Sequence, residues 1–324
     1  MAKIAKNRPQ AFDALLSVAT EAIVGKGEDS YAHHIGHDRA LIAAFDGCGG
    51  LGAQKYERFE QRTGAYIASH MAASAVLRWY GGVSSKAAGL RPAEPLRSEV
   101  QRALQDEMKN LVESAQSPNL LMGSMVRRFP TTAVIALLDR VPEGGLDALF
   151  LWAGDSRGYA LTHEGLVQLT KDELRGDPDA MDNLYADAPM SNCVSADGAV
   201  TLQSLSLCLP APCIAMVATD GAFGYLPSPM HFELMLLEAL CGASSPGQCE
   251  DTLTARLKGL AGDDCTLLMA AHGWRDYPSL KRDFQPRLEA LRALLRGRDG
   301  MDALRDIWAE YRLRYEGGAQ SWVK

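Results

Sequence analysis

The sequence predicts a single α/β sandwich, and two observations carry that prediction. Short apolar runs rich in β-forming residues alternate, in one continuous pattern, with segments whose apolar residues recur at helical spacing. A hydrophobic content of 47% is ample for a sizeable core in a chain of 324 residues. We therefore expect one domain that combines sheets and helices rather than two separate domains.

Apolar runs of strand length define the expected sheets. They lie at residues 14–24, 40–45, 131–138, 147–170, 212–226 and 263–273, and turns divide the fourth into two or three strands. Several of these runs begin or end at an acidic residue. The stretch Leu41–Gly50, which reads LIAAFDGCGG, is the first example.

Three segments between the runs have helical periodicity, at residues 66–80, 98–115 and 231–241. In the first of them, four apolar residues recur every four positions and would share one face: Ile67, Met71, Ala75 and Trp79. Residues 81–95, rich in Gly, Ser and Pro, are expected to form a surface loop.

From Pro278 onward the pattern becomes helical alone. Apolar residues at helical spacing lie on both sides of a break at Gly297–Gly300, which predicts a helical hairpin. We expect its apolar stripe to pack on the preceding domain, because exposed stripes of that size are unusual on monomers. The alternative is that these C-terminal helices bind a protein partner.

Composition excludes several classes of partner. The net charge of −7 gives no general basic field that would attract nucleic acid or an anionic membrane. The sequence shows neither a signal peptide nor an apolar stretch long enough to span a bilayer, so we expect a cytoplasmic protein. The seven cysteines include no Cys-x-x-Cys pair and are expected to be reduced thiols.

Acidic residues recur where an apolar run meets a turn. They are Glu28, Asp29, Asp46, Asp155, Asp220, Asp263 and Asp264. A sheet could bring all of them to one edge, where carboxylates at that density would repel one another strongly without a cation between them. Because hard divalent cations prefer oxygen ligands, the pattern favours a metal site.

Six motifs follow one another between about Glu21 and Ala271: GEDS, FDGCGG, TTAV, WAGDSRGYAL, ATDGAFGYL and DDCTLLM. In this order they resemble the metal-dependent type 2C (PPM) serine/threonine protein phosphatases of the bacterial type. The resemblance implies an α+β fold, a four-layer α-β-β-α sandwich of two antiparallel sheets flanked by helices. It also implies a phosphatase-like domain of residues 1–273, followed by a C-terminal helical extension of residues 274–324 that packs on it.

The resemblance further implies a binuclear Mn²⁺ or Mg²⁺ centre at one end of the sandwich. Asp46 would bridge the two metals, and the carbonyl group of Gly47 would bind one of them. Asp220 and Asp263 would complete the first metal site. Residues 46–50 would then form a metal-binding turn rather than a phosphate-binding loop.

Glu28 and Asp29 would hold water ligands of the second metal, and Asp155 with Asp220 would hold a third, weaker one. Two metals that share a water make hydroxide available near neutral pH and offset charge on the phosphoryl oxygens. No protein nucleophile is then needed. The sequence agrees, since it contains no Cys-x5-Arg loop and no Gly-x-Ser-x-Gly elbow.

The chain departs from the family pattern at Val24, where members often carry an arginine that binds the substrate phosphate. Lys26 is the nearest cation and could act as a point charge without bidentate geometry, although a solvated surface lysine is an equally good interpretation. Arg157 or a residue of the long loop is the other candidate. We therefore assign catalytic roles to Asp46, Asp29 and Lys26.

Two further positions differ from relatives. Cys48 occupies the place of a histidine in some of them, and neighbouring carboxylates should raise its pKa, which favours inert packing over a reactive thiol. Asp264 replaces an asparagine. It could accept hydrogen bonds beside the metal site, replace Asp263 as a ligand, or be a solvated charge, and counting back from Thr266 favours Asp263 as the ligand.

Residues 171–209 are expected to cover a flap next to the site, because this segment is acidic and turn-rich. Its acids Asp177, Asp179, Asp182 and Asp187 would favour basic substrates, although an ordinary solvated loop is at least as good an interpretation. The sequence thus predicts metal-dependent hydrolysis of phosphoserine or phosphothreonine in a phosphoprotein substrate. The alternatives are a weakly active or inactive binding protein of the same fold, and a phosphatase for anti-sigma antagonists of the sporulation type.

Overall fold

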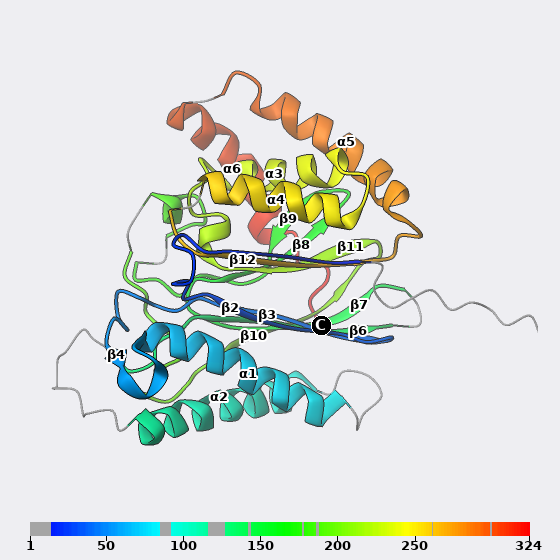
Figure 1. Ribbon diagram of the computed structural model, residues 1–324. Coiled ribbons are helices and arrows are strands. Elements are labelled where there is room, and N and C mark those ends of the chain that lie inside the picture. The colour runs from blue at the N-terminus through cyan, green and yellow to red at the C-terminus, as the bar shows by residue number, and fades with distance from the viewer. Residues whose placement is uncertain are drawn as a thin grey trace, which may run out of the picture.

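The computed structural model describes residues 14–84, 92–115, 127–141, 144–176, 178–185, 188–260, 262–298 and 300–324. Two five-stranded antiparallel sheets lie face to face, and helices cover the outer face of each (Figure 1). The predicted four-layer α-β-β-α sandwich is therefore confirmed.

The first sheet has the strand order β1-β12-β11-β8-β9. Its strands, in that order, are Ala14–Thr20, Cys265–His272, Cys213–Ala218, Arg157–Thr162 and Gly165–Gln168. Every neighbouring pair is antiparallel. The three inner strands, β12, β11 and β8, are buried along their whole length, which explains why the sequence shows β12 and β11 as continuous apolar runs.

The second sheet has the order β10-β7-β6-β3-β2. Its strands are Gln203–Leu209, Leu146–Ala153, Ala133–Arg140, Arg39–Phe45 and Ser30–Ile35. Strand β10 lies within residues 171–209, the segment predicted to form a flap. The predicted flap therefore extends too far toward the C-terminus. Alternate residues Leu205, Leu207 and Leu209 face inward, and the polar residues around them obscure this period-2 pattern in the sequence.

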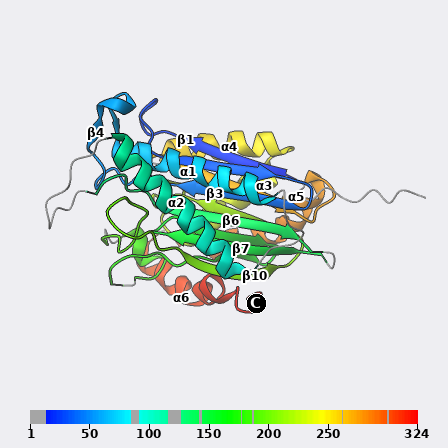
Figure 2. The same cartoon turned by 90° about the horizontal axis from the view of Figure 1, so that it is seen from below.

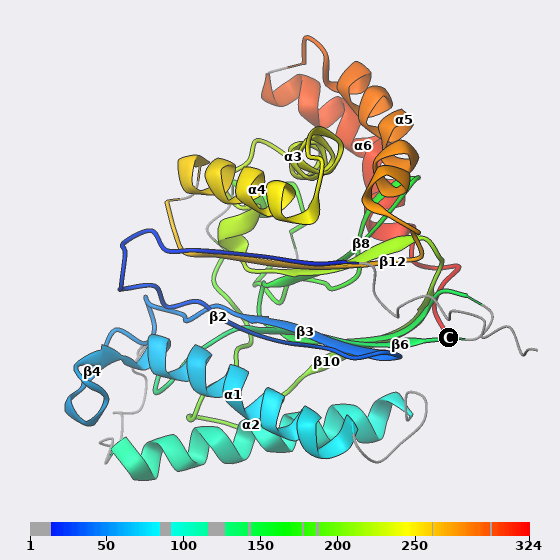
Figure 3. The same cartoon turned by 45° about the vertical axis from the view of Figure 1, so that its right-hand side comes forward.

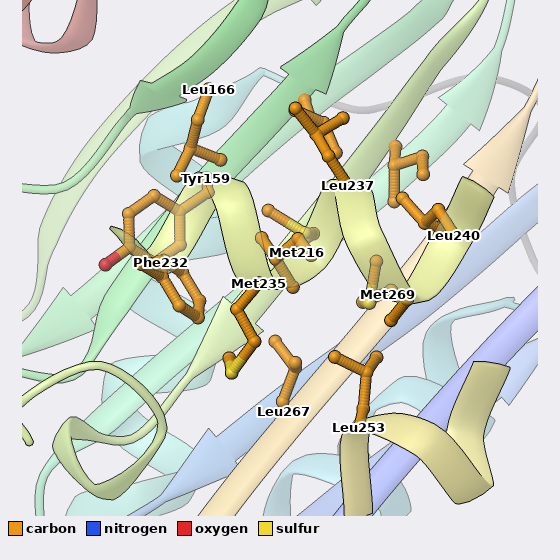
Figure 4. Close-up of a cluster of buried hydrophobic side chains, with 14 of the residues drawn as sticks. Tyr159, Leu166, Met216, Phe232, Met235, Leu237, Leu240, Leu253, Leu267 and Met269 are labelled. Atoms are coloured by element: carbon orange, nitrogen blue, oxygen red, sulfur yellow. The ribbon is translucent and has the colours of Figure 1, made fainter. Parts of the chain in front are cut away.

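Helices α1 (Gly64–Ser84) and α2 (Ala93–Ala115) cover the second sheet, as the view from below shows (Figure 2). Helices α3 (Pro229–Gly242) and α4 (Pro246–Leu260) cover the first sheet (Figure 3). Large side chains of α3, among them Phe232 and Leu237, interlock with sheet residues such as Met216 and Met269 (Figure 4). Burial of this kind contributes roughly 1.5–3 kcal/mol for each large apolar side chain.

The C-terminal residues form α5 (Tyr277–Leu295) and α6 (Met301–Gly317). Asp276 begins α5 with a capping box, in which its side chain accepts from Ser279 N–H and the Ser279 hydroxyl bonds back to Asp276. The apolar residues of both helices belong to the same buried cluster as the first sheet and α3. The apolar stripe is thus covered by the chain itself, and nothing in the structure supports a protein partner there.

Short elements complete the description: β4 (Lys55–Tyr56), β5 (Arg62–Thr63) and the 3-10 turns η1 (Glu57–Phe59), η2 (Asp182–Leu184) and η3 (Asp220–Ala222). All seven cysteines are free thiols. No helix in the described ranges is long and apolar enough to cross a membrane.

Candidate metal centre

The strand register brings the predicted acids to one end of the sandwich. In the second sheet, Ser30 pairs with Phe45 and Ala133 pairs with Ala153, so residue 29, residue 46 and residue 155 all lie just beyond the same edge. In the first sheet, Ala218 pairs with Leu267, which places the end of β11 beside the start of β12. Asp220 follows that strand end and Asp263 precedes that strand start.

A threonine joins the two sheets at this end. Thr219, directly after β11, donates its hydroxyl to the carboxylate of Asp29 from the other sheet (2.8 Å). The same hydroxyl oxygen accepts the backbone N–H of Thr266 (2.8 Å). Thr219 was not among the predicted site residues, although its place beside Asp220 in ATDG was the available signal.

The turn after β3 is fixed by the TTAV motif. The backbone N–H of Thr132 and the hydroxyl of Thr131 both donate to the carbonyl oxygen of Asp46 (2.8 and 2.7 Å). Gly47 is packed so closely that an added Cβ would lie 2.7 Å from the carbonyl oxygen of Glu28 and 2.8 Å from that of Ala65. Glycine is required here by this close approach of backbone segments.

The carboxylates perturb one another strongly. Burial raises the pKa of Asp46 well above its ordinary value, and the charges of Asp220, Asp29, Asp155 and Asp263 raise it further. The resemblance assigns direct metal contact to Asp46 and to some other carboxylates. All of those other carboxylates are among these four neighbours. The predicted acids are therefore assembled into one electrostatic cluster.

Other members of the cluster respond in the same direction. Burial raises the pKa of Asp29 to about 7 against the hydrogen bond from Thr219. Burial, followed by the charge of Asp220, raises the pKa of Asp155 to about 7. The pKa of Asp220 is raised by burial and by Asp263. Such a concentration of unneutralised negative charge is typical of a cation site.

The donor set fits a hard divalent cation that also binds water and backbone oxygen. Carboxylate oxygens are suitable ligands, and the buried Oδ1 of Asp155 has no hydrogen-bond partner among the described residues. No three His, Cys, Asp or Glu side chains in the described ranges are grouped so that they could hold an ion by themselves. Any ion here would therefore take several ligands from water and from carbonyl groups.

Glu28 is held by the neighbouring helix start. Its carboxylate accepts a hydrogen bond from the hydroxyl of Thr63, and its carbonyl oxygen accepts one from Ser69 (2.5 Å). Burial and the charges of Asp264 and Asp263 raise its pKa, against the hydrogen bond from Thr63. Glu28 thus lies at the border of the cluster rather than at its centre.

Asp264 and Asp263 have different surroundings. The buried carboxylate of Asp264 accepts the backbone N–H groups of Ala22 (2.9 Å) and Glu28 (2.5 Å), which fixes the loop between β1 and β2. Asp263 is exposed, and its side chain forms no hydrogen bond with that loop in the described structure. Of the three interpretations left open for Asp264, the structure supports the hydrogen-bond acceptor.

The predicted phosphate-binding cations are not both available. Arg157 is 1% exposed, binds Asp172 with two guanidinium nitrogens (2.6–3.0 Å) and lies over the ring of Phe223. A role for Arg157 in phosphate binding is therefore wrong, because its guanidinium is part of the core. Lys26 is exposed, and its backbone N–H donates to the carbonyl oxygen of Ile23.

Arg62 is a cation that the sequence interpretation missed. Its guanidinium donates to the carbonyl oxygen of Gly25 (2.8 Å) and lies 4.3 Å from the centroid of the Tyr66 ring. The next residue, Thr63, is the hydroxyl donor to Glu28. A cavity of about 430 Å³, lined among others by Val24 and Asp29, opens beside the same loop.

The flap is tied to the C-terminal helices. Asp179 accepts hydrogen bonds from Trp308 (3.1 Å) and Arg312 (3.0 Å) of α6, and also from the backbone N–H groups of Met181 and Asp182. Asp179 is therefore occupied within the protein and does not present a free charge to a substrate. Asp177 and Asp187 lie outside the described residues.

No protein-family model matches the sequence, and no curated protein matches it. Solved structures do match. The serine/threonine phosphatase Stp1 from Staphylococcus aureus is 17% identical with a TM-score of 0.57, over 84% of this chain and 100% of that one.

Two more solved structures match this chain over nearly their whole length. The PPM Ser-Thr phosphatase MsPP from Mycobacterium smegmatis, in complex with cacodylate, is 12% identical (TM-score 0.56; 81% of this chain, 99% of that one). The catalytic domain of the phosphatase PstP in complex with two manganese ions is 17% identical (TM-score 0.53; 80% and 97%). The chain has the fold of the PPM serine/threonine phosphatases.

Proposed function

We propose that this protein is a metal-dependent phosphatase that hydrolyses phosphoserine or phosphothreonine in protein substrates, with two Mn²⁺ or Mg²⁺ ions. The observation that carries the proposal is the cluster around Asp46, where burial and the charges of four other carboxylates raise its pKa at the end of a phosphatase-type sandwich. Repulsion of that size is relieved by divalent cations. The manganese ions in the PstP structure support the same class of ion.

In this proposal the Asp46 carboxylate would help to hold both ions, together with the carbonyl oxygen of Gly47 and the carboxylates of Asp220 and Asp263. Divalent cations, when bound, lower the pKa of a shared water and offset charge on the phosphoryl oxygens. The chain's own contribution is positional. The two threonine donors to the Asp46 carbonyl hold the turn, and Thr219 fixes one carboxylate oxygen of Asp29.

Glu28 and Asp29 would orient waters on the other side of Asp46, and Asp155 with Asp220 would form the third, weaker site. The unpartnered Oδ1 of Asp155 supports that assignment. Lys26 remains a proposed phosphate contact, because its side chain is exposed to solvent. A cytoplasmic location also remains a proposal.

The test is hydrolysis of a phosphothreonine peptide by the full chain with added Mn²⁺, beside EDTA-treated protein and the Asp46→Asn variant. We expect activity that requires Mn²⁺ and falls by roughly 10³-fold or more in the variant, since a central charge contact to the metals is lost. Calorimetric titration with Mn²⁺ gives a readout independent of turnover. Equal hydrolysis by wild type and variant would contradict the proposal.

A non-catalytic binding protein of the same fold is the second candidate. The observation in its favour is Val24, which is 92% exposed where a phosphate-binding arginine was expected. Binding of the phosphopeptide and Mn²⁺ without turnover would establish that function instead.

A further inference from the structure

Two buried hydroxyl groups lie between the turn that carries Asp46 and the turn that carries Asp155. The Oγ1 atom of Thr132 accepts the backbone N–H of Asp46 (3.1 Å), and it lies 2.6 Å from the Oγ atom of Ser156, within hydrogen-bond distance. Thr132 is 0% exposed and Ser156 is 1% exposed. The sequence interpretation assigned no role to either hydroxyl group.

Thr132 binds both backbone groups of Asp46. Its N–H donates to the carbonyl oxygen of Asp46 (2.8 Å), which also accepts the hydroxyl of Thr131 (2.7 Å). Its hydroxyl oxygen accepts the Asp46 N–H, so the peptide groups on either side of the Asp46 Cα are both held. The backbone from which the Asp46 carboxylate extends is therefore fixed by this threonine pair.

The turn at Asp155 is packed against the same threonine. Gly154 has a φ of +96°, and an added Cβ would lie only 2.9 Å from Cγ2 of Thr132. Glycine is required for this conformation and for this close approach. On the other side of Asp155 in the sequence, Ser156 bonds to the Thr132 hydroxyl. Both neighbours of Asp155 therefore hold its turn against Thr132.

The two acids joined in this way act on each other electrostatically. Burial raises the pKa of Asp46, and the charge of Asp155 is among those that raise it further. A cation that relieves this repulsion needs its carboxylates at a suitable separation. Groups that hold metal ligands in position, without touching the metal, typically change metal affinity by about ten- to a hundredfold when they are removed.

We propose that Thr132 and Ser156 are positioning residues, whose hydroxyl groups hold the Asp46 and Asp155 turns at the separation that a divalent cation requires. This inference rests on the proposed function, because it concerns the ions of the same centre. Neither hydroxyl is assigned a contact with the ion or the substrate. Thr132 acts through the backbone of Asp46, and Ser156 acts through Thr132.

Calorimetric titration of the full chain with Mn²⁺ tests this role without turnover. Thr132→Val nearly keeps the shape of the side chain but removes the hydroxyl, and we expect the Mn²⁺ affinity to fall roughly ten- to a hundredfold. Thr132→Ser retains a hydroxyl and should restore most of the affinity. Thr162→Val is the matched control and should bind Mn²⁺ as wild type does, because its buried hydroxyl accepts the N–H of Glu164 (3.3 Å) at the opposite end of β8.

Ser156→Ala provides a milder test. It leaves the Asp46 N–H bonded to Thr132 and removes only the bond between the two turns. We expect a smaller loss of Mn²⁺ affinity than in Thr132→Val, and no further loss when the two substitutions are combined, since Ser156 acts through the Thr132 hydroxyl. At saturating Mn²⁺, the KM of Ser156→Ala for a phosphothreonine peptide should equal that of wild type.

Thermal unfolding of each metal-free protein shows which variants are folded before they are titrated. Wild-type Mn²⁺ affinity in Thr132→Val, or an equal loss in Thr132→Val and Thr162→Val, would overturn the positioning role. If Thr132→Val does not fold, Ser156→Ala decides, and an unchanged Mn²⁺ affinity in that variant would overturn it. A folded wild-type protein that binds no Mn²⁺ would refute the proposed metal centre itself, and the positioning role with it.

Discussion

Asp263 and Asp264 are neighbours in the sequence, but the structure gives them different tasks. Asp264 accepts two backbone N–H groups of the β1–β2 loop, whereas Asp263 is exposed beside the cluster. We predict that Asp264→Leu lowers the free energy of unfolding by about 1–3 kcal/mol for each N–H group left without a partner. Chemical denaturation of the metal-free protein measures this.

The matched control is Asp263→Leu, which should leave the stability of the metal-free protein within about 0.5 kcal/mol of wild type, as an exposed position does. It should instead weaken Mn²⁺ binding in calorimetry. If the two variants exchanged these effects, Asp264 would be the ligand and the assignment would be reversed.

Arg62 is placed to compensate for Val24. Because its guanidinium already binds the loop next to Glu28, we predict that it also contacts the substrate phosphate. Arg62→Ala should raise KM by roughly ten- to a hundredfold, which corresponds to about 1.5–3 kcal/mol for a charged hydrogen bond, with a smaller effect on kcat.

Steady-state kinetics on a phosphothreonine peptide check this. Arg58→Ala is the control, because Arg58 is exposed and donates to the carbonyl oxygen of Ser114, away from the acids. An unchanged KM in Arg62→Ala would leave Lys26 as the cation to examine.

At the scale of elements, α5 is fixed to α3 by a buried ion pair. Arg287 binds Glu233 with two nitrogens (2.6 and 2.8 Å), the Glu233 side chain is 0% exposed, and Tyr311 of α6 donates to the same carboxylate. We predict that Arg287→Met costs about 3–5 kcal/mol of stability, since Glu233 would be left as a buried charge without its partner.

Thermal or denaturant unfolding tests this beside Arg292→Met. Arg292 makes a comparable pair with Glu238, but both side chains are partly exposed, so its loss should cost less than about 1 kcal/mol. Equal losses in the two variants would show that burial of the pair does not decide its contribution.

At the scale of the whole molecule, the fold was predictable because most of its strands are short apolar runs and its motifs occur in a specific order. The gathering of Asp29, Asp46, Asp155 and Asp220 at one end was also predictable, because each acid adjoins a strand terminus. Contacts between segments distant in sequence were not. The pairing of Arg157 with Asp172 could not be inferred from spacing, because both residues lie in polar surroundings in the sequence and only packing buries them.

The same reason explains why Thr219 and Arg62 were missed. Each acts through a residue on another element: Asp29 and the loop at Gly25. Sequence periodicity reports which face of an element is buried, but not which polar group it meets there. The division between a domain ending at residue 273 and an extension from 274 stays a prediction, although α5 and α6 share the core of the first sheet.

The acid cluster makes the stability of the whole metal-free protein depend on pH. Asp29 and Asp155 have folded-state pKa values of about 7, well above the ordinary value for an aspartate, because burial and mutual repulsion favour their protonated forms. The folded state therefore binds more protons than the unfolded state between about pH 4 and about pH 7. Stability contributed by these groups is complete below their unfolded pKa and is lost as the pH rises through the folded pKa.

We predict that the melting temperature of metal-free protein, set against that of Asp155→Asn, falls as the pH rises from about 5 to about 8. The variant lacks one of the two titrating carboxyl groups, so it removes part of the slope while retaining the other acids. Added Mn²⁺ should raise the wild-type melting temperature more at the higher pH, because cations bind the ionised carboxylates and must displace protons at the lower pH. Scanning calorimetry of both proteins with and without Mn²⁺ provides the comparison. Equal slopes in wild type and variant, together with a Mn²⁺ shift that does not grow with pH, would mean that the cluster neither repels itself nor binds the ion, and the proposed metal centre would have to be abandoned.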